Sequence, residues 1–490
     1  MCSISLCMIV RDEEDFLAEC LRSVEGIVDE IVLVDTGSTD CTLDIARQFG
    51  ARYYSVAWTP DFSKMRNLSL HFATKDYILV LDADEVLTLK GCASIRRSLE
   101  EFPNADAFFV HILNQTDGEG MIEVEESLNV RLFRNNPQYR YQGALHEQIA
   151  ESILHANPPG VIFDSDIELL HRGYLKNVVL KKHKKKRNLD IALREIKLHP
   201  EDGFRMFNLG VEYVRDRQLD QALSVFHAVH EKVNPSALWV SRFYKVYIST
   251  LMQAGKWEEA DQVLEEAVKL FPDYTDLVYL KGVYYSQRGE WILALQHYAT
   301  CIEMGDPPIP PYTIEKGISS YRAYFAMGYS FGAIGKIAEA AVAYRQAFEQ
   351  NPSFTQAFLR FSNFLLREDT SNATLDYLRS IAALSGGNQF ALLGISLALS
   401  DQFEQAKEYL ERAERTSDVV EHLILTYVCL DERESLRELL EQYDPEGELQ
   451  ARVQRYLFER GRKMIHLGIE KFPESSLLSK LKEEYEKGFR

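Results

Sequence analysis

The strongest constraint on the fold of this chain is the apolar run at residues 77–81, which ends in Asp82-Ala83-Asp84. An earlier apolar run, residues 31–34, ends in the same way at Asp35. Short aliphatic runs bounded by polar residues are typical of buried parallel strands, and the loops at the carboxyl ends of such strands bind ligands in open α/β sheets. Two such loops close together in the chain predict one shared site.

Strand and helix patterns alternate through the first part of the chain. Strands are expected at residues 4–10, 29–34, 51–56 and 77–81, and helices at residues 16–24, 42–49 and 63–73. This order predicts an α/β domain with a mostly parallel sheet and right-handed crossovers. After Glu85 the pattern is less regular, with a helix near 91–101 and strands at 107–113, 128–134 and 167–171, so we expect a mixed sheet edge.

From about residue 188 the sequence changes to long segments with a helical period and a recurring pair of small residues. In most places a glycine is followed twelve positions later by an alanine, and the pairs are Gly210/Ala222, Ile248/Ala260, Gly282/Ala294, Gly328/Ala340 and Gly394/Ala406. The alanines are 38, 34, 46 and 66 residues apart. Helix pairs that cross tightly at small residues match the tetratricopeptide pattern of roughly 34 residues, here in an irregular all-α array.

Two interruptions and a C-terminal extension of this array are expected. Residues 306–311 form an inserted proline-rich loop, and the longest gap holds a degenerate repeat. Residues 418–443 and 453–485 have helical patterns and continue or cap the solenoid.

Composition excludes several classes of protein. A net charge of −19 disfavours binding to nucleic acid or to an anionic membrane, because the long-range field repels both. The seven cysteines are scattered without a CxxC pair, so neither a disulfide framework nor a zinc site is indicated. No signal-peptide pattern and no run of 18 apolar residues is found. We expect a cytoplasmic protein without a membrane span.

A series of short strings occurs in a fixed order along the chain. They are CMIVRDEE (7–14), LRSV (21–24), EIVLVDTGSTD (30–40), Trp58, DFS (61–63), RN (66–67), LDADE (81–85), YQGALHE (141–147) and LHRGY (170–174). Together they resemble the family-2 inverting glycosyltransferases with an A-type nucleotide-sugar fold, in particular bacterial members that carry C-terminal tetratricopeptide repeats. The resemblance covers roughly residues 3–175 for the enzyme and 200–415 for the repeats. In layout the chain is similar to peptide S-glycosyltransferases and to core-sugar transferases of lipopolysaccharide.

The resemblance implies a domain organisation. It places a catalytic domain at residues 1–178, a basic helical linker at 179–200 and the repeats at 201–490. The basic run at 181–187 is interpreted as a solvated helix face, with contact to an anionic acceptor or donor as the alternative. The QxxRW string of processive synthases is missing, which favours the addition of a single sugar.

The resemblance also implies a metal site. Asp82 and Asp84 would bind Mn²⁺ or Mg²⁺, because two carboxylates one residue apart on an extended segment can reach one hard cation. His171 would be a third ligand or a phosphate contact, since imidazole binds transition metals. The alternatives are an acidic turn after a strand and an ordinary buried histidine.

The resemblance implies six residues that bind the nucleotide-sugar donor. Two are Asp82 and Ala83, and the other four are Asp35, Arg11, Arg66 and Asp61. Asp35 matches the nucleotide-contacting aspartate of the family, with capping as the alternative. Arg11 would reach a base or phosphate, or is a solvated loop cation. Arg66 would hold the diphosphate with two hydrogen bonds, and the alternative is an arginine on the helix surface. Asp61 would orient Arg66 or touch the sugar hydroxyls, and the alternative is a helix cap.

Inverting transfer needs a group that removes a proton from the attacking acceptor. Glu147 is the first candidate for this base and His146 is the second, while each can also be a polar loop residue. The resulting hypothesis is a metal-dependent inverting transferase that moves one hexose or N-acetylhexosamine from a UDP-sugar to a peptide or protein held by the repeats.

Two alternatives stay open. The acceptor can be a glycan or a lipid-linked sugar, with the repeats used for homodimer formation. The chain can also be a non-catalytic tetratricopeptide scaffold whose sugar-binding domain recognises a partner.

Overall fold

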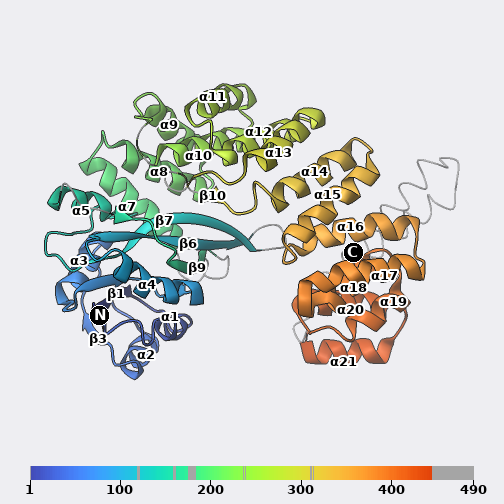
Figure 1. Ribbon diagram of the computed structural model, residues 1–490, viewed down its shortest axis with the longest axis horizontal. Coiled ribbons are helices and arrows are strands. Elements are labelled where there is room, and N and C mark those ends of the chain that lie inside the picture. Colours follow the sequence, from blue (N-terminus) through green and yellow to red (C-terminus); the bar gives the residue numbers. More distant parts are fainter. Residues whose placement is uncertain are drawn as a thin grey trace, which may run out of the picture. The chain divides into compact units, whose positions relative to one another are not determined.

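The computed structural model describes residues 2–117, 122–157, 162–174, 184–235, 237, 239–308, 312 and 314–443. By packing, the chain divides into two compact units, Met1–Ala323 and Tyr324–Arg490. The first unit holds the sheet and the first helix pairs of the array (Figure 1). The boundaries expected at residues 178 and 200 stay predictions, and the helix expected at 453–485 lies outside the described residues.

The first unit is built on a mixed sheet with the strand order β3-β2-β1-β4-β7-β6-β9-β5. The strands are β1 (Ile4–Val10), β2 (Glu30–Asp35), β3 (Arg52–Ser55), β4 (Tyr77–Val80), β5 (Glu85–Leu87), β6 (Ala107–Asp117), β7 (Ile122–Arg134), β8 (Ile162–Phe163) and β9 (Glu168–Tyr174). Strands β3, β2, β1 and β4 are parallel, whereas β7 runs antiparallel to both β4 and β6. The predicted parallel sheet with a mixed edge is confirmed.

Helices cover both faces of this sheet, and this explains its unbroken aliphatic runs. The helices are α1 (Leu17–Ser23), α2 (Thr42–Gln48), α3 (Phe62–Phe72), α4 (Leu89–Glu101) and α5 (Ala150–Ala156). Along β1, Leu6 and Met8 pack in one core cluster with residues of α1 and α4, while Cys7 between them packs in the other with residues of α3 and α5. A strand buried on both faces has no polar positions to alternate with.

The predicted helical repeats are confirmed. After α7 (Lys184–Leu198) the pairs are α8 (Gly203–Arg215) and α9 (Leu219–His230), α10 (Val240–Gln253) and α11 (Trp257–Leu270), α12 (Thr275–Gln287) and α13 (Trp291–Met304), α14 (Tyr321–Ala333) and α15 (Ile337–Gln350), α16 (Thr355–Glu368) and α17 (Asn372–Ala382), α18 (Gln389–Leu399) and α19 (Phe403–Leu410), and α20 (Ser417–Cys429) and α21 (Arg433–Tyr443). The expected degenerate repeat is α16 and α17. The helical expectation for residues 418–443 is met by α20 and α21.

The recurring glycines are explained by the large side chain that follows each alanine. A Cβ atom added to Gly210 would lie 2.1 Å from the ring of Phe226, and one added to Gly282 would lie 2.5 Å from the ring of Tyr298. In these pairs, and in α14/α15, the second helix therefore inserts a ring where the first helix has no side chain, while in α18/α19 Leu410 takes the place of the ring against Gly394.

The insertion in the array is more than the expected loop. Within it, β10 (Ile314–Glu315) pairs antiparallel with β7 of the sheet. Lys316 Nζ lies 3.1 Å from Glu126 Oε2 on β7, and Glu315 Oε1 lies 2.7 Å from Lys245 Nζ on α10. The insertion thus joins the sheet to the repeats within the first unit. A two-residue strand in a proline-rich segment leaves no pattern that a sequence reading can detect.

One stretch in the second unit is apolar enough, by length and composition, to cross a membrane. It is Asn372–Leu399, and 44% of its most apolar window is buried. The backbone leaves helical geometry at Gly386, which has φ +63° and ψ −121°, so the stretch comprises α17 and α18 rather than one continuous helix. The expected lack of a membrane span stays a prediction.

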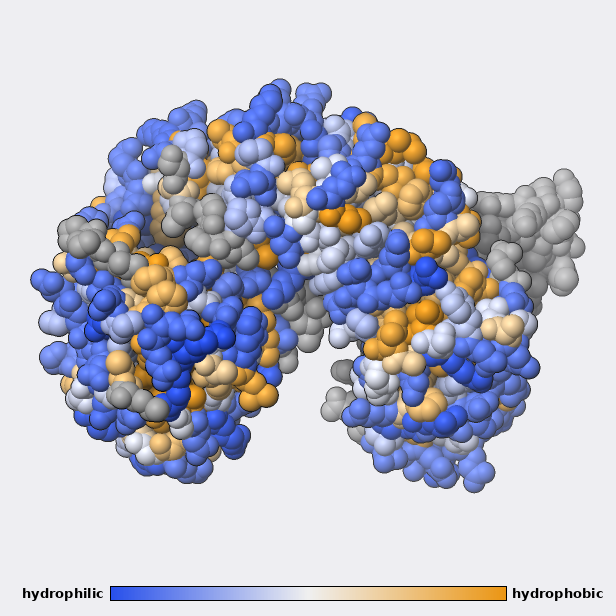
Figure 2. Space-filling model, viewed as in Figure 1, coloured by the Kyte–Doolittle hydropathy of each residue, from blue (hydrophilic) through white to orange (hydrophobic). Residues whose placement is uncertain are grey.

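The surface of the second unit carries an apolar region over α14 and α15 (Figure 2). Tyr329, Ile337 and Val342 are large apolar residues exposed on these helices. Such a region on a repeat array is a candidate contact surface.

The packing of the repeats predicts opposite effects for two glycines on α14. A Cβ atom at Gly328 would lie 2.7 Å from the ring of Tyr344, whereas one at Gly332 would lie 3.9 Å from Phe364. Gly328→Ala should lower the free energy of unfolding by about 1–3 kcal/mol, because α14 and α15 must move apart to make room for the added methyl group. Gly332→Ala should leave it unchanged or raise it by up to ~1 kcal/mol, through helix propensity. Urea unfolding of both variants tests this, and equal effects would contradict the packing account.

Candidate functional site

A cavity of about 1320 Å³ in the first unit is lined by five of the ten residues that the sequence predicts for the site. Its wall from the α/β domain includes Arg66, Asp82, His146, Glu147 and His171. Its other wall comes from α8 and from the residues around the start of α10. The sheet and the first repeat therefore enclose one space.

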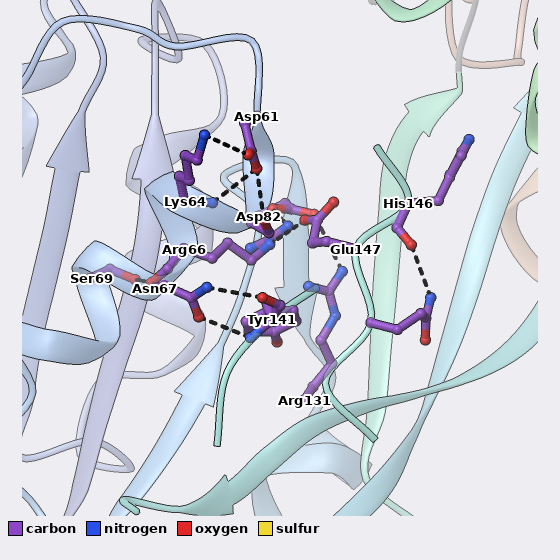
Figure 3. Close-up of polar contacts among 12 residues, drawn as sticks. Asp61, Lys64, Arg66, Asn67, Ser69, Asp82, Arg131, Tyr141, His146 and Glu147 are labelled. Carbon is purple, nitrogen blue, oxygen red and sulfur yellow. Dashed lines mark hydrogen bonds and ion pairs between the residues drawn. The ribbon is translucent and has the colours of Figure 1, made fainter. Parts of the chain in front are cut away.

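Arg66 of α3 is the centre of a buried network of charges (Figure 3). Its Nη2 donates to Asp82 Oδ1 at 2.7 Å, and its Nε donates to Glu147 Oε1. Arg131 of β7 donates from Nη2 to Asp82 Oδ2 at 3.2 Å and to Glu85 Oε1 at 2.6 Å. Two guanidinium groups thus bind both oxygens of the strand-end aspartate.

The charges of this network shift the pKa values of its carboxyl groups in opposite directions. Burial favours the neutral form of Asp82, but Arg66 and Arg131 outweigh burial and hold its pKa well below the ordinary value. Burial raises the pKa of Glu85 despite its contact with Arg131, and the nearby charge of Asp82 adds to the rise. Of these two carboxyl groups, Asp82 is therefore the one that stays ionised to low pH, and Glu85 is the one that takes up a proton more readily.

The loop at residues 141–148 is fastened to α3 at both ends. The Asn67 side chain makes two hydrogen bonds with the backbone of Tyr141, donating to its carbonyl at 2.9 Å and accepting from its N–H at 2.8 Å. Backbone hydrogen bonds of 2.9 and 3.0 Å join residues 142 and 148 and close the loop. Gly143 has φ +94°, which only glycine adopts without strain. Arg66 and Asn67, neighbours in sequence, hold Glu147 and Tyr141.

The opposite side of the same loop faces the helices that follow the α/β domain. The N–H of Ala144 donates to Glu195 Oε2 on α7 at 3.1 Å. His146 Nε2 lies 3.4 Å from Glu212 Oε1 on α8. In Figure 3 Glu147 points toward Arg66 and His146 points away from it. The loop is therefore held from two sides.

Asp84 and His171 form a second polar pair next to this network. The pairing of β5 with β9 brings residues 85 and 171 opposite each other. As a result, His171 Nε2 lies 3.5 Å from Asp84 Oδ1. His171 Nδ1 lies 2.8 Å from Asn114 Oδ1, and the amide of Asn114 donates to Ser127 Oγ, which fixes the orientation of the Asn114 side chain.

This pair fits a divalent metal. Because Asn114 presents an acceptor to Nδ1, that nitrogen carries a proton, and Nε2 faces the carboxylate either with a second proton that it donates to Asp84 or with a lone pair that can bind a metal. A lone pair facing a carboxylate oxygen needs a cation or a proton between them, and metal-bound histidines are held by an outer acceptor in this way. Burial lowers the pKa of His171, but Asp84 and the neighbouring carboxylates raise it overall. The described residues contain no group of three such ligands.

Several predicted site residues lie outside the cavity wall. Arg11 is 56% exposed in its side chain and lies 3.7 Å from its neighbour Asp12. Asp35 is buried at the end of β2, and its Oδ1 accepts from the N–H of Ser38 at 3.0 Å. Asp61 caps α3 by accepting from the N–H of Lys64. Their contacts with a donor stay predictions.

The remaining predicted residues at the strand end are buried. Ala83 and Asp84 are both enclosed, and the carbonyl of Asp84 accepts from the N–H of Arg172 at 3.1 Å. Asp82 is paired with arginines, so its role as a metal ligand also stays a prediction.

The sequence reading missed Arg131, Asn114 and Glu212. An arginine within the apolar run of β7 was a sign of a buried charge that needs an acidic partner. For Asn114 and Glu212 the sequence offers no comparable sign, because each partner comes from a distant part of the chain.

Comparisons with known proteins agree with this arrangement. The family model "Glycosyl transferase family 2" matches residues 5–156, and tetratricopeptide repeat models match residues 248–305 and 321–354. A TPR repeat-containing protein of Synechococcus elongatus is 38% identical over 229 residues, 45% of this chain and 55% of that protein. The SPbeta prophage-derived glycosyltransferase SunS of Bacillus subtilis is 27% identical over 224 residues, 43% of this chain and 49% of that protein. The chain thus spans about half the length of these relatives.

One of the similar solved structures was determined with ligands. It is glucosyl-3-phosphoglycerate synthase from Mycobacterium tuberculosis in complex with Mn²⁺ and UDP-glucose, 22% identical, with 23% of this chain and 44% of that chain covered. The TM-score of this match is 0.21.

The charge network predicts a pH-dependent loss of stability in Asp82→Asn. The folded pKa of Asp82 is depressed, so its ion pairs stabilise the fold above the unfolded pKa of about 4 and are lost as pH falls through the folded value. The variant should be less stable than the wild type by about 2 kcal/mol from pH 8 to 5, with the gap narrowing below about pH 4.

Urea unfolding at several pH values measures this gap. Asp44→Asn is the matched control, because Asp44 pairs with Arg47 on the exposed surface, and it should cost less than about 0.5 kcal/mol. A gap for Asp82→Asn that stays constant down to pH 2 would contradict the assignment.

Proposed function

We propose, from the premise that residues 5–156 form a family 2 glycosyl transferase domain followed by tetratricopeptide repeats, that this chain is a metal-dependent inverting transferase. It moves one hexose or N-acetylhexosamine from a UDP-sugar to a side chain of a peptide or protein. The cytoplasmic location expected from the sequence is part of this proposal.

The pair of Asp84 and His171 is the observation that carries the proposal. Its geometry, with Nδ1 of His171 committed to Asn114, suits Mn²⁺ or Mg²⁺. When bound there, the metal would neutralise charge on the departing diphosphate. The chain's own residues then hold the rest of the donor.

Unsatisfied donors in the charge network support binding of an anion. Arg66 Nη1, Arg131 Nε and the hydroxyl of Tyr141 are buried and make no hydrogen bond within the part of the chain that the structure describes. All three residues line the cavity. Buried donors without partners are costly, and phosphate oxygens of a nucleotide sugar would satisfy them after a small adjustment of the loop.

A peptide or protein acceptor is supported by the shape of the cavity. The wall opposite the charge network is formed by α8 and by Trp239, next to the start of α10, so an acceptor that enters from the repeats meets the loop at 141–148. The resemblance to peptide S-glycosyltransferases points the same way.

The second candidate function is transfer to a glycan or a lipid-linked acceptor, with the repeats used for dimer formation. The exposed apolar residues of α14 and α15 favour this candidate, because a contact between two copies would cover them. Sedimentation of the protein after Val342→Glu separates the two: a dimer that dissociates supports this second candidate.

A thermal-shift screen of UDP-glucose and UDP-N-acetylglucosamine, each with Mn²⁺ or with EDTA, tests the proposal. A donor present at 100 times its dissociation constant should stabilise the protein by about 2.7 kcal/mol, and the metal should increase this effect. His171→Ala should remove the part of this stabilisation that depends on Mn²⁺. His155→Ala is the control, because that histidine is exposed on α5 and bonds to the backbone of its own helix.

Two outcomes would contradict the proposal. If neither donor raises the melting temperature with Mn²⁺, the chain is better explained as a scaffold. If His171→Ala retains the full Mn²⁺ effect, the metal lies elsewhere.

A further inference from the structure

We propose that the repeat helices are part of the transfer site, and that Glu212 of α8 is a positioning residue that acts on the loop at residues 141–148 through His146. The inference rests on the proposed function and adds a role for the repeats in the chemical step. Under the simpler view, the repeats only bind the acceptor.

The carboxylate of Glu212 is buried between one hydrogen-bond donor and one close neighbour. Its side chain is 1% exposed, and Arg215 Nη1 donates to Oε1 at 2.6 Å. His146 Nε2 lies 3.4 Å from the same oxygen and makes no hydrogen bond within the described residues, so a small turn of either side chain would complete the contact. Burial favours the neutral acid, but His146 and Arg215 outweigh it and lower the pKa of Glu212. A buried anion is costly unless its partners are well placed, so its contact with the loop is a defined feature of the fold.

The backbone of His146 is held in an unfavourable conformation. Its φ is +55°, in the left-handed region that non-glycine residues seldom adopt. Such strain persists only where the surroundings determine it, and it gathers at functional sites. Here the surroundings are Glu212 on one side and, through Glu147, Arg66 on the other. The conformation turns two adjacent side chains to opposite sides of the loop.

A second contact from the repeat side supports the same conclusion. Glu195 of α7 accepts from the N–H of Ala144 and also from Arg205 Nε of α8, each at 3.1 Å. Two buried or half-buried carboxylates from consecutive helices therefore bind the loop. If α7 and α8 moved away, the loop that carries Glu147 and His146 would lose these contacts and be held only from α3 and by its own backbone hydrogen bonds.

The chemical consequence concerns the alignment of the acceptor. In the transfer, an acceptor O–H or S–H attacks the anomeric carbon, its proton passes to the base on the loop, and the bond from that carbon to the diphosphate breaks with its electron pair on the diphosphate. A base displaced by about 1 Å can lower the rate about 100-fold. Glu212 should therefore affect kcat more than the KM for the donor.

The test is a double-mutant cycle between Glu212→Gln and His146→Ala. The readout is release of UDP from the UDP-sugar that binds in the thermal-shift screen, with Mn²⁺ present and water as acceptor. Glu212→Gln should lower kcat about 10-fold or more with the KM for the donor within about twofold. In the His146→Ala background the same change should have no further effect, because the residue acts through His146. Glu195→Gln should lower kcat in the same direction.

Glu259→Gln is the matched control. Glu259 also pairs with a histidine, His227, on a neighbouring helix of the array, but both side chains are partly exposed and neither lines the cavity, so its loss should leave kcat unchanged. Melting temperatures of all variants separate a loss of folding from a loss of alignment.

The outcomes separate the proposed function from the role of Glu212. No UDP release by the wild type overturns the proposed function. Release by the wild type with kcat of Glu212→Gln unchanged, or with the effects of Glu212→Gln and His146→Ala simply additive, overturns the role of Glu212 and leaves the proposed function standing.

Discussion

The site depends on the ion pairs that the Arg66 guanidinium makes with Asp82 and Glu147. A planar guanidinium can bind two carboxylates in fixed directions, and Arg66 uses this to join Asp82, at the end of the strand region, to Glu147 on a loop far away in sequence. Arg131 supports it by taking the second oxygen of Asp82. Without these pairs, the buried carboxylates would repel one another and the loop would lose its anchor on the sheet.

The same loop is the point where the sheet and the repeats meet. Asn67 and Arg66 hold it from α3, and Glu195 and Glu212 hold it from α7 and α8. The insertion that adds β10 to the sheet fastens a later repeat to the same domain. The first repeats are therefore part of one folded unit with the α/β domain, and the cavity between them has walls from both.

The sequence predicted the architecture better than it predicted the partners of individual side chains. Buried strands and the glycine and alanine pairs leave local patterns, so the sheet and the helix pairs were foreseen. The binding of a diphosphate by Arg66 stays a prediction, and the structure adds a pairing of Arg66 with Asp82 and Glu147 that was not predicted. That pairing joins residues separated by 81 positions along the chain, and no local pattern encodes it. The role of Asn114 in orienting His171 was missed for the same reason.

The central claim is that Asp84 and His171 bind the metal while Arg66 keeps the loop in place. Its most direct test is a crystal structure with Mn²⁺ and a UDP-sugar, with data collected at the manganese absorption edge. The account predicts an anomalous peak about 2.1 Å from both Asp84 Oδ1 and His171 Nε2, with Arg66 still bound to Glu147. A peak elsewhere, or an Arg66 that leaves Glu147 to bind the diphosphate, would contradict it.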